Sequence, residues 1–272
     1  MGLQIIDEFI ENKILPTMKE INGFYNFQNI EKNSIIGIYG LHGGIGVSSF
    51  IHELCYKLSQ ETDNKILIID GNYLFPKQRI YGENKKFNNF LNINFKESLQ
   101  TDTINKCITK ITNMDNVFLL GQHPVSMMNL IQNDSKILYN HLQNLLNALI
   151  KQFNIILIDL NIYLLCFFIE QILLKNCSLL IELSDNSLDT ILNQNNINDV
   201  VRFTIDNNIF ENRLIIKNKT DHNSNLYLPY ENNFNEIYNS AGIFLKNGRE
   251  EKNYSEAFNN VYKALMEKIN DK

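Results

Sequence analysis

One segment, Ser34–Ser49, constrains the fold of this chain more than any other part of the sequence. It begins with an apolar, β-branched run, passes into a glycine-rich turn and continues into a predicted helix. Phosphate-binding loops have this layout and end in G-K-S/T, where main-chain N–H groups cradle phosphates, the lysine neutralises them and the hydroxyl holds magnesium. Here Gly46 and Ser48 occupy the outer positions of that ending, but Val47 replaces the lysine. The segment therefore predicts a nucleotide-binding architecture whose catalysis is impaired or lost.

The composition favours one large core and argues against a protein dominated by nucleic-acid binding. The 272 residues are 44% hydrophobic, which is enough to bury a single α/β domain. The net charge is −5, whereas neutralising a phosphate backbone needs clustered Lys and Arg. The N-terminus does not resemble a secretory signal, and the apolar segment Tyr163–Leu174 is short and contains Glu170, which favours a buried helix. We therefore expect a cytoplasmic protein.

Short β-branched runs alternate with helical segments along the chain. Near-continuous apolar strands of this kind, separated by helices, are typical of a parallel sheet covered on both faces. The expected strands are Ile35–Tyr39, Lys65–Ile69, Val117–Leu120, Ile155–Ile158, Ser178–Leu183 and Leu214–Lys217, and the expected helices between them are Ser48–Gln60, Ile137–Gln152 and Leu188–Thr204. The predicted fold class is α/β, a doubly wound and mainly parallel sheet, which binds ligands beyond the carboxyl ends of its strands.

The glycine-rich turn resembles the deviant loop of the MinD/ParA family of P-loop ATPases, and within that family the degenerate TadZ-like pilus-localising proteins. The family's loop reads K-G-G-x-G-K-S/T-S/T, and the resemblance implies that its first lysine reaches the phosphates of the partner subunit in an ATP-sandwich dimer. This chain reads H-G-G-I-G-V-S-S from His42 to Ser49. Both lysines are replaced, by His42 and by Val47, while the glycines and hydroxyls remain.

Further segments resemble the family's other motifs in the expected order, so that the resemblance covers about residues 34–269. Ile66–Asn72 is similar to the strand ending in D-x-D, with Asn72 at the position of the carboxylate that helps to place the attacking water. Asp159 ends a strand similar to the family's Walker B strand, and Asn116–Gly121 is similar to a core strand followed by glycine. Near the end, Leu214–Lys219 is similar to a strand whose terminal asparagine reads adenine, and Leu228–Tyr230 to a segment packed beside the base.

The resemblance implies a nucleotide site with a magnesium ion but no intact catalytic set. Its nucleotide-binding residues are Gly43, Gly44, Ile45, Gly46, Val47, Ser48, Ser49, Asn218 and Pro229. Magnesium is expected at Ser48 and Asp159 when ATP or ADP binds. Several roles remain open, because Asp159 is also placed to cap a helix and Asn218 to close a turn. His42 is an exposed loop residue, a group that contacts phosphate when protonated, or a replacement for the lysine that reaches the partner subunit.

The domain organisation follows from the same pattern. We expect a P-loop NTPase-like domain over residues 34–272, preceded by an N-terminal helical extension, residues 1–33, that either packs on the domain edge or docks a partner. The polar segment 75–100 is expected to be a long loop. The last helix, Tyr254–Ile269, is apolar along one side, and its opposite face mixes Glu267 with lysines, which favours core packing over membrane binding.

These expectations lead to a dimerising localisation or assembly factor rather than a fast enzyme. The resemblance implies a homodimer and a protein partner within a pilus, secretion or partition machine, with recruitment to the pole or the inner membrane face. Nucleic acid and direct membrane binding are not expected. A competing hypothesis is a slow ATPase of the ParA/MinD type whose lysine comes from elsewhere, such as Lys217, Lys219 or a partner chain. A third is a DNA-associated partition protein.

Overall fold

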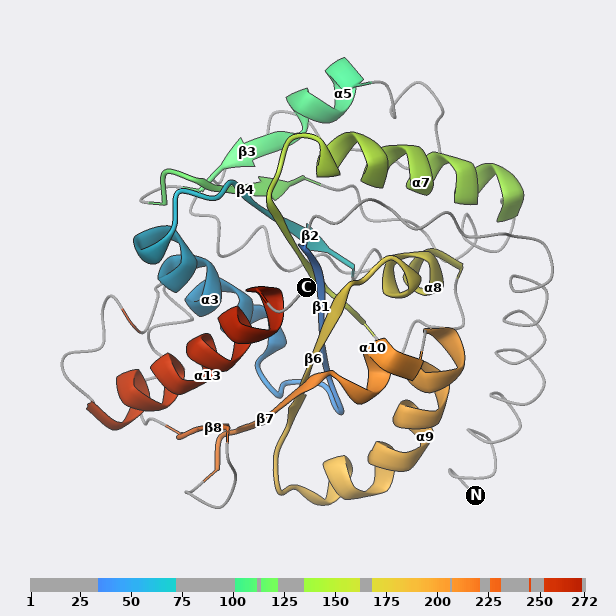
Figure 1. The fold of residues 1–272 in the computed structure, drawn as a ribbon. Helices are drawn as coiled ribbons and strands as arrows, with labels where there is room; N and C mark the ends of the chain where they lie inside the picture. Colours follow the sequence, from blue (N-terminus) through green and yellow to red (C-terminus); the bar gives the residue numbers. More distant parts are fainter. Residues whose placement is uncertain are drawn as a thin grey trace.

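The computed structural model describes residues 34–71, 101–111, 114–121, 135–161, 168–205, 207–220, 226–230, 245 and 252–270. Over these ranges an eight-stranded sheet is sandwiched between two layers of helices (Figure 1). The strands are β1 (Ser34–Gly40), β2 (Ile66–Asp70), β3 (Ile108–Lys110), β4 (Val117–Leu120), β5 (Ile155–Asp159), β6 (Leu179–Ser184), β7 (Leu214–Asn218) and β8 (Tyr227–Leu228). The helices are α3 (Val47–Glu61), α5 (Thr101–Lys106), α7 (Ser135–Ile150), α8 (Phe168–Lys175), α9 (Leu188–Thr204), α10 (Asn207–Glu211) and α13 (Lys252–Asn270).

The sheet runs in the order β3-β4-β2-β5-β1-β6-β7-β8, and every neighbouring pair is parallel except β3 with β4. The chain passes from β1 to β2 on one side and later adds β6 and β7 on the other. The carboxyl end of β1 is therefore the point where the strand order reverses, which is where open α/β sheets bind their ligands. The predicted fold class is confirmed.

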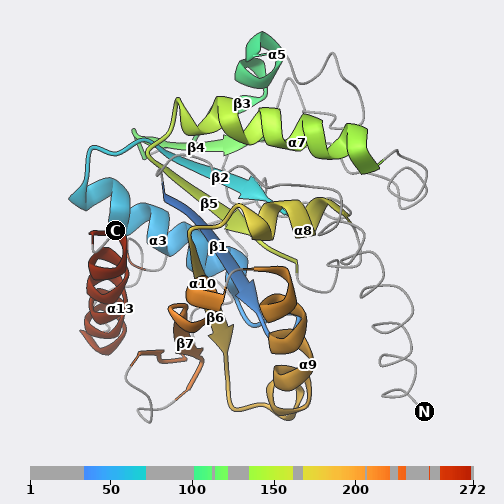
Figure 2. The same cartoon turned by 45° about the vertical axis from the view of Figure 1, so that its right-hand side comes forward.

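Two apolar clusters fill the space above and below the sheet. One lies between the sheet and helices α7, α8, α9 and α10, and the other between the sheet and helices α3 and α13 (Figures 1 and 2). In the central strand, Ile36 and Ile38 point to the α3 and α13 side, whereas Ile35 and Tyr39 point to the opposite side. Because both faces are covered, this strand needs an almost unbroken apolar run, as its sequence has.

The predicted strands and the four long helices are confirmed, with strand ends shifted by one residue at most. In α13, Tyr254, Phe258, Val261 and Leu265 are buried against the sheet, so the prediction of core packing for the last helix is confirmed. The short apolar segment predicted as a buried helix overlaps α8, whose Ile172 and Leu174 are fully buried, while residues 163–167 of that segment lie outside the described ranges. No helix within the described ranges is both long and apolar enough to cross a bilayer.

Four short elements, β3, β8, α5 and α10, were not predicted, because they are too brief to carry a periodic signal. Three predictions fall on residues outside the described ranges: the helical extension of residues 1–33, the loop of residues 75–100 and the placement of Asn72.

Candidate nucleotide-binding site

The glycine loop lies between β1 and α3, at the carboxyl end of the central strand. Gly44 and Gly46 have φ angles of 79° and 105°, a region that side chains disfavour. Gly40 is required for a different reason, since a Cβ there would lie 2.3 Å from the Cγ2 of Ile45. Gly43 and Gly44 are exposed, and a Cβ on either would meet no atom within 4 Å. The loop is thus tightly packed at Gly40 and exposed to solvent at Gly43 and Gly44.

The start of α3 offers an anion site made from the main chain. Gly46 is its N-cap, and no side chain in the described part of the chain caps it; the first turn also carries no acidic residue. The first intrahelical bond runs from the Phe50 N–H to the Gly46 carbonyl at 2.9 Å, which leaves the preceding N–H groups of the turn without an intrahelical partner. Such a terminus attracts phosphate through its N–H groups and the helix dipole.

The end of β7 holds the loop in place. The Asn218 amide donates to the Ile45 carbonyl at 2.6 Å in a buried hydrogen bond, and its own carbonyl accepts from the Lys219 N–H at 3.1 Å. Both polar ends of the Asn218 side chain are therefore used within the chain. The predicted contact of Asn218 with adenine stays a prediction, and it would use the second N–H and the second lone pair of this amide. Pro229 follows β8 beside Tyr230, which is 47% exposed.

A lysine does reach the loop, but not from the signature position. Val47 is partly buried and packs against the core on the α3 side. The Lys219 ammonium instead donates to the Gly44 carbonyl at 2.8 Å, while the Lys217 ammonium lies 3.4 Å from the carbonyl oxygen of Asp185. Of the two lysines named as alternative sources of the missing charge, Lys219 is the one that contacts the glycine turn.

His42 is held within its own chain. Its Nε2 lies 2.9 Å from a carboxylate oxygen of Asp185, which follows β6, and its Nδ1 lies 2.9 Å from the Gly43 carbonyl. Asp185 also accepts from the hydroxyls of Ser187 and Thr190, both at 2.6 Å. Partial burial favours a higher pKa for the Asp185 carboxyl, but these hydrogen bonds, with those from the Ser187 N–H and His42, hold its pKa well below the usual range.

This polar cluster was not predicted. A signal for it exists in the sequence, because Asp185 and Ser187 directly precede α9, and the Ser187 hydroxyl caps that helix by accepting from the Thr190 N–H. The prediction of His42 as an exposed loop residue is wrong, since its side chain is 16% exposed and bound to Asp185.

Ser48 and Asp159 meet directly. The Ser48 hydroxyl donates to the Asp159 carboxylate at 2.6 Å, and Asp70 lies on the neighbouring strand in register with Asp159. A hydroxyl and carboxylate oxygens are the hard ligands that Mg²⁺ prefers, and Mg²⁺ is usually completed by nucleotide phosphates and water. Among the described residues, no group of three His, Cys, Asp or Glu could hold a metal unaided. The residues present fit a magnesium ion that arrives with a nucleotide.

The fold and the loop together define a P-loop NTPase-type α/β architecture. No protein-family profile matches the sequence, and no curated protein matches it. Solved structures do match. A putative plasmid partition protein from Borrelia burgdorferi bound to AMPPNP superposes with a TM-score of 0.60 at 19% identity, covering 88% of this chain and 100% of that one.

Two MinD structures are also similar. The septum site-determining protein MinD of Pyrococcus horikoshii, complexed with Mg-ADP, has a TM-score of 0.61 at 16% identity and covers 85% of this chain and 95% of that one. The MinC:MinD cell division complex of Aquifex aeolicus has a TM-score of 0.61 at 13% identity, with coverage of 86% and 95%. At these identities the likeness establishes the fold, which is that of the ParA/MinD P-loop ATPases.

The depressed pKa of Asp185 predicts a specific change in acid stability. A carboxyl whose pKa is lower in the folded state stabilises the protein above its unfolded pKa, about 4, and loses that contribution as the pH falls. We expect Asp185→Asn to cost about 1–3 kcal/mol of unfolding free energy at pH 7, because the donors around it lose a charged acceptor. The cost should shrink towards pH 2.5. Denaturant unfolding across this pH range measures it.

Asp189→Asn is the matched control, since Asp189 is exposed in the first turn of α9. This control variant should lose at most about 1 kcal/mol of unfolding free energy, because its charge no longer interacts with the helix dipole. An Asp185→Asn variant whose stability parallels that of the unaltered protein at every pH would contradict the assignment.

Proposed function

We propose that this chain is a degenerate member of the MinD/ParA family that binds Mg-ATP or Mg-ADP and hydrolyses ATP weakly or not at all. The observation that carries the proposal is the contrast within one loop. The main-chain geometry and the Ser48–Asp159 hydrogen bond of a nucleotide site are present, whereas a partly buried valine, Val47, stands where the signature lysine is needed.

Binding is supported by groups that survive the substitutions. The loop of residues 43–46 and the uncapped start of α3 offer N–H groups to phosphates, and Lys219 supplies a cation beside the turn. Ser48 and Asp159 would hold the magnesium ion, which screens the phosphate charge when bound. Structures with this fold hold AMPPNP in the Borrelia protein and Mg-ADP in the Pyrococcus protein. Pro229 and Asn218 remain the proposed residues near the base.

Weak turnover follows from the side chains that are missing or engaged. Phosphoryl transfer depends on positioning and on stabilising charge that develops in the transition state. Val47 supplies no charge. His42, at the position of the lysine that reaches across an ATP-sandwich dimer, is bound to Asp185 of its own chain at 2.9 Å. Lys219 favours the second candidate, a slow ATPase, because it is the described lysine whose ammonium contacts the turn.

Dimerisation is supported by an apolar cluster beside the loop. Leu188, Ile191 and Leu192 in the first turns of α9 are 68%, 63% and 51% exposed. They lie on one side of the helix at i, i+3 and i+4 spacing. The hydroxyl of Ser187, which precedes them, lies 3.3 Å from the Nε2 of His42. A large apolar side chain left in water costs free energy that an interface recovers. We therefore place the homodimer contact across the glycine loop and the start of α9.

The dimer would act as a positional factor. With hydrolysis slow or absent, its lifetime would be set by dissociation, so that it would serve as a scaffold for a protein partner. The partner would belong to a pilus, secretion or partition machine at the cell pole or inner membrane face, as in TadZ-like proteins. A protein partner is consistent with the fold, since MinD of Aquifex aeolicus forms a complex with MinC.

Nucleotide binding should depend on Lys219. Replacing it with Gln removes one charge-assisted contact, worth about 1.5–3 kcal/mol, so we expect Lys219→Gln to weaken Mg-ATP binding about 10- to 100-fold. Isothermal titration calorimetry with and without magnesium gives the affinity. Lys263→Gln, an exposed lysine on α13, is the control and should bind as the unaltered protein does. If neither the unaltered protein nor either variant binds ATP or ADP, the proposal of a nucleotide site fails.

The dimer should require the α9 cluster. We expect Leu188→Ser combined with Ile191→Ser to lower the dimer fraction at least about tenfold, because two exposed apolar contacts are lost, while the thermal midpoint stays unchanged. Sedimentation velocity with Mg-ATP measures the fraction. Ile215→Ser, at a 42% exposed apolar residue on β7, is the matched control. Dimers that form equally well in the double variant would exclude this face.

A further inference from the structure

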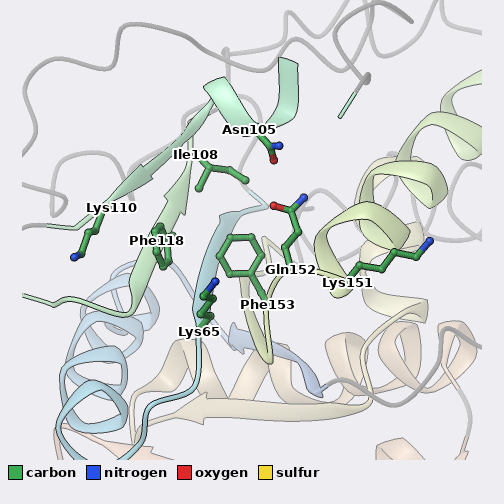
Figure 3. Close-up of a pocket in the computed structure, with 8 residues that line it drawn as sticks. All are labelled: Lys65, Asn105, Ile108, Lys110, Phe118, Lys151, Gln152 and Phe153. Atoms are coloured by element: carbon green, nitrogen blue, oxygen red, sulfur yellow. The ribbon is translucent and has the colours of Figure 1, made fainter. Parts of the chain in front are cut away.

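A hollow lies at the end of the sheet opposite the glycine loop. It has a volume of about 630 Å³ and is lined by Lys65, Asn105, Ile108, Lys110, Phe118, Lys151, Gln152 and Phe153 (Figure 3). Lys65 directly precedes β2 and Phe153 closely precedes β5, whereas Asp70 and Asp159, near the glycine loop, end those same strands. A five-residue strand spans about 16 Å, so the two sites do not share residues or ligands.

The floor of this hollow is the edge of the core. The rings of Phe118 and Phe153 meet edge to face, with centroids 5.5 Å apart and planes 63° to each other. Phe153 is 5% exposed and belongs to the cluster covered by α7, and Phe118 and Ile108 pack against the same cluster. Ordered rings at the bottom of a hollow give a bound apolar body a fixed surface.

The rim is cationic, in contrast to the chain as a whole. Three of the eight lining residues are lysines and none is acidic, in a protein of net charge −5. Lys65 and Lys151 form no ion pair with any residue that the structure describes. Lys110 pairs with Asp115 at 2.7 Å, but both side chains are at least half exposed, so the pair is worth little. A bound anion would contact Lys65 and be attracted by the more distant charges of Lys110 and Lys151.

Figure 3 shows how these groups are arranged. The Lys65 side chain lies below the two phenylalanine rings in this view, and Asn105 and Gln152 face each other at the upper rim. Lys110 and Lys151 extend outward on opposite sides. The two amides add donors and acceptors to a site that otherwise combines rings with positive charge. An apolar floor, a polar rim and a few convergent groups are what small-molecule sites share, and the volume lies within their usual range of about 300–1,000 Å³.

We propose that this hollow, lined by Lys65, Lys151, Phe118 and Phe153, binds an aromatic organic anion: a flat ring system that carries a phosphate, sulfonate or carboxylate. The ring lies on the phenylalanine floor, the anionic group is bound by Lys65, and Lys151 adds a positive charge at one side of the hollow. Single-stranded nucleic acid shares this chemistry in part, but it needs a positively charged groove that follows its backbone, whereas this hollow is a single site of about 630 Å³. A small ligand therefore fits better than a polynucleotide. The inference does not depend on the glycine loop.

The test uses anilinonaphthalene sulfonate, a fluorescent aromatic anion, with the full-length protein. We expect saturable binding to one site, and we expect the Lys65→Gln/Lys151→Gln variant to weaken it about 10- to 100-fold, because one charge-assisted contact and a nearby positive charge are lost. Lys263→Gln/Lys268→Gln on α13 removes the same total charge elsewhere and should leave the affinity unchanged. Gly46→Val, which disrupts the glycine loop, should also leave it unchanged.

An uncharged probe, competing ligands and thermal melts show whether binding depends on the anionic group and on the hollow. Phenylnaphthylamine, which has the ring body without the charge, should bind at least tenfold more weakly to the unaltered protein. Adenosine monophosphate, an aromatic carboxylate and an oligonucleotide are tested as competitors, and displacement by either small anion identifies the natural group. Equal affinity in the pocket and control lysine variants, or displacement by the oligonucleotide alone, would overturn the proposal. Thermal melts of each variant show that probe binding does not report unfolding.

Discussion

The candidate site depends on one buried hydrogen bond, from the Asn218 amide to the Ile45 carbonyl. It joins the glycine loop to the end of β7, two strands away from β1 in the sheet. Without it, a carbonyl in a partly enclosed turn loses its partner, at a cost of about 1–3 kcal/mol. The same side chain explains the need for glycine at position 46, since a Cβ there would lie 2.9 Å from the Asn218 amide nitrogen. Lys219 reaches Gly44 because it follows this anchor.

The arrangement separates two properties that intact P-loops combine. Affinity for phosphate comes largely from main-chain N–H groups and a helix terminus, which tolerate changes of side chain as long as the glycines remain. Turnover depends on side-chain charges placed against the transition state. In this chain the main-chain phosphate-binding groups are retained. The charged side chains near the loop are reduced to Lys219, which follows β7, and His42, which is already bound to Asp185. A nucleotide-binding scaffold is the function that this division supports best.

Much of the fold follows from the sequence, because buried strands must be apolar throughout. Ile155–Asp159 and Leu179–Ser184 stand out for that reason, and so does the glycine turn between β1 and α3. The contact between Ser48 and Asp159 could also be expected, since the glycine loop before Ser48 follows β1 and Asp159 ends the neighbouring strand β5 at the same edge of the sheet. The antiparallel β3 and the two-residue β8 could not, because their hydrogen-bond partners rather than their own periodicity define them.

Side-chain partners far apart in sequence were the least predictable part of the site. The pairing of His42 with Asp185 spans 143 positions and leaves no local pattern at His42. Lys219 was one of two named lysines, and the choice between them depends on the turn after β7, where Lys219 itself has a φ of 58°. The lysine-rimmed hollow is lined by the residue before β2, by residues of α5, β3 and β4, and by the segment after α7. The strand order brings these segments together.

The most direct test of the account is a single-turnover measurement, with protein in excess over ATP labelled at the γ-phosphate and with magnesium present. We predict that the nucleotide is bound and that it stays intact for hours, because binding and hydrolysis rest on different groups. Rapid, magnesium-dependent release of the labelled phosphate that Gly46→Val abolishes would contradict the central claim and identify the chain as an active ATPase.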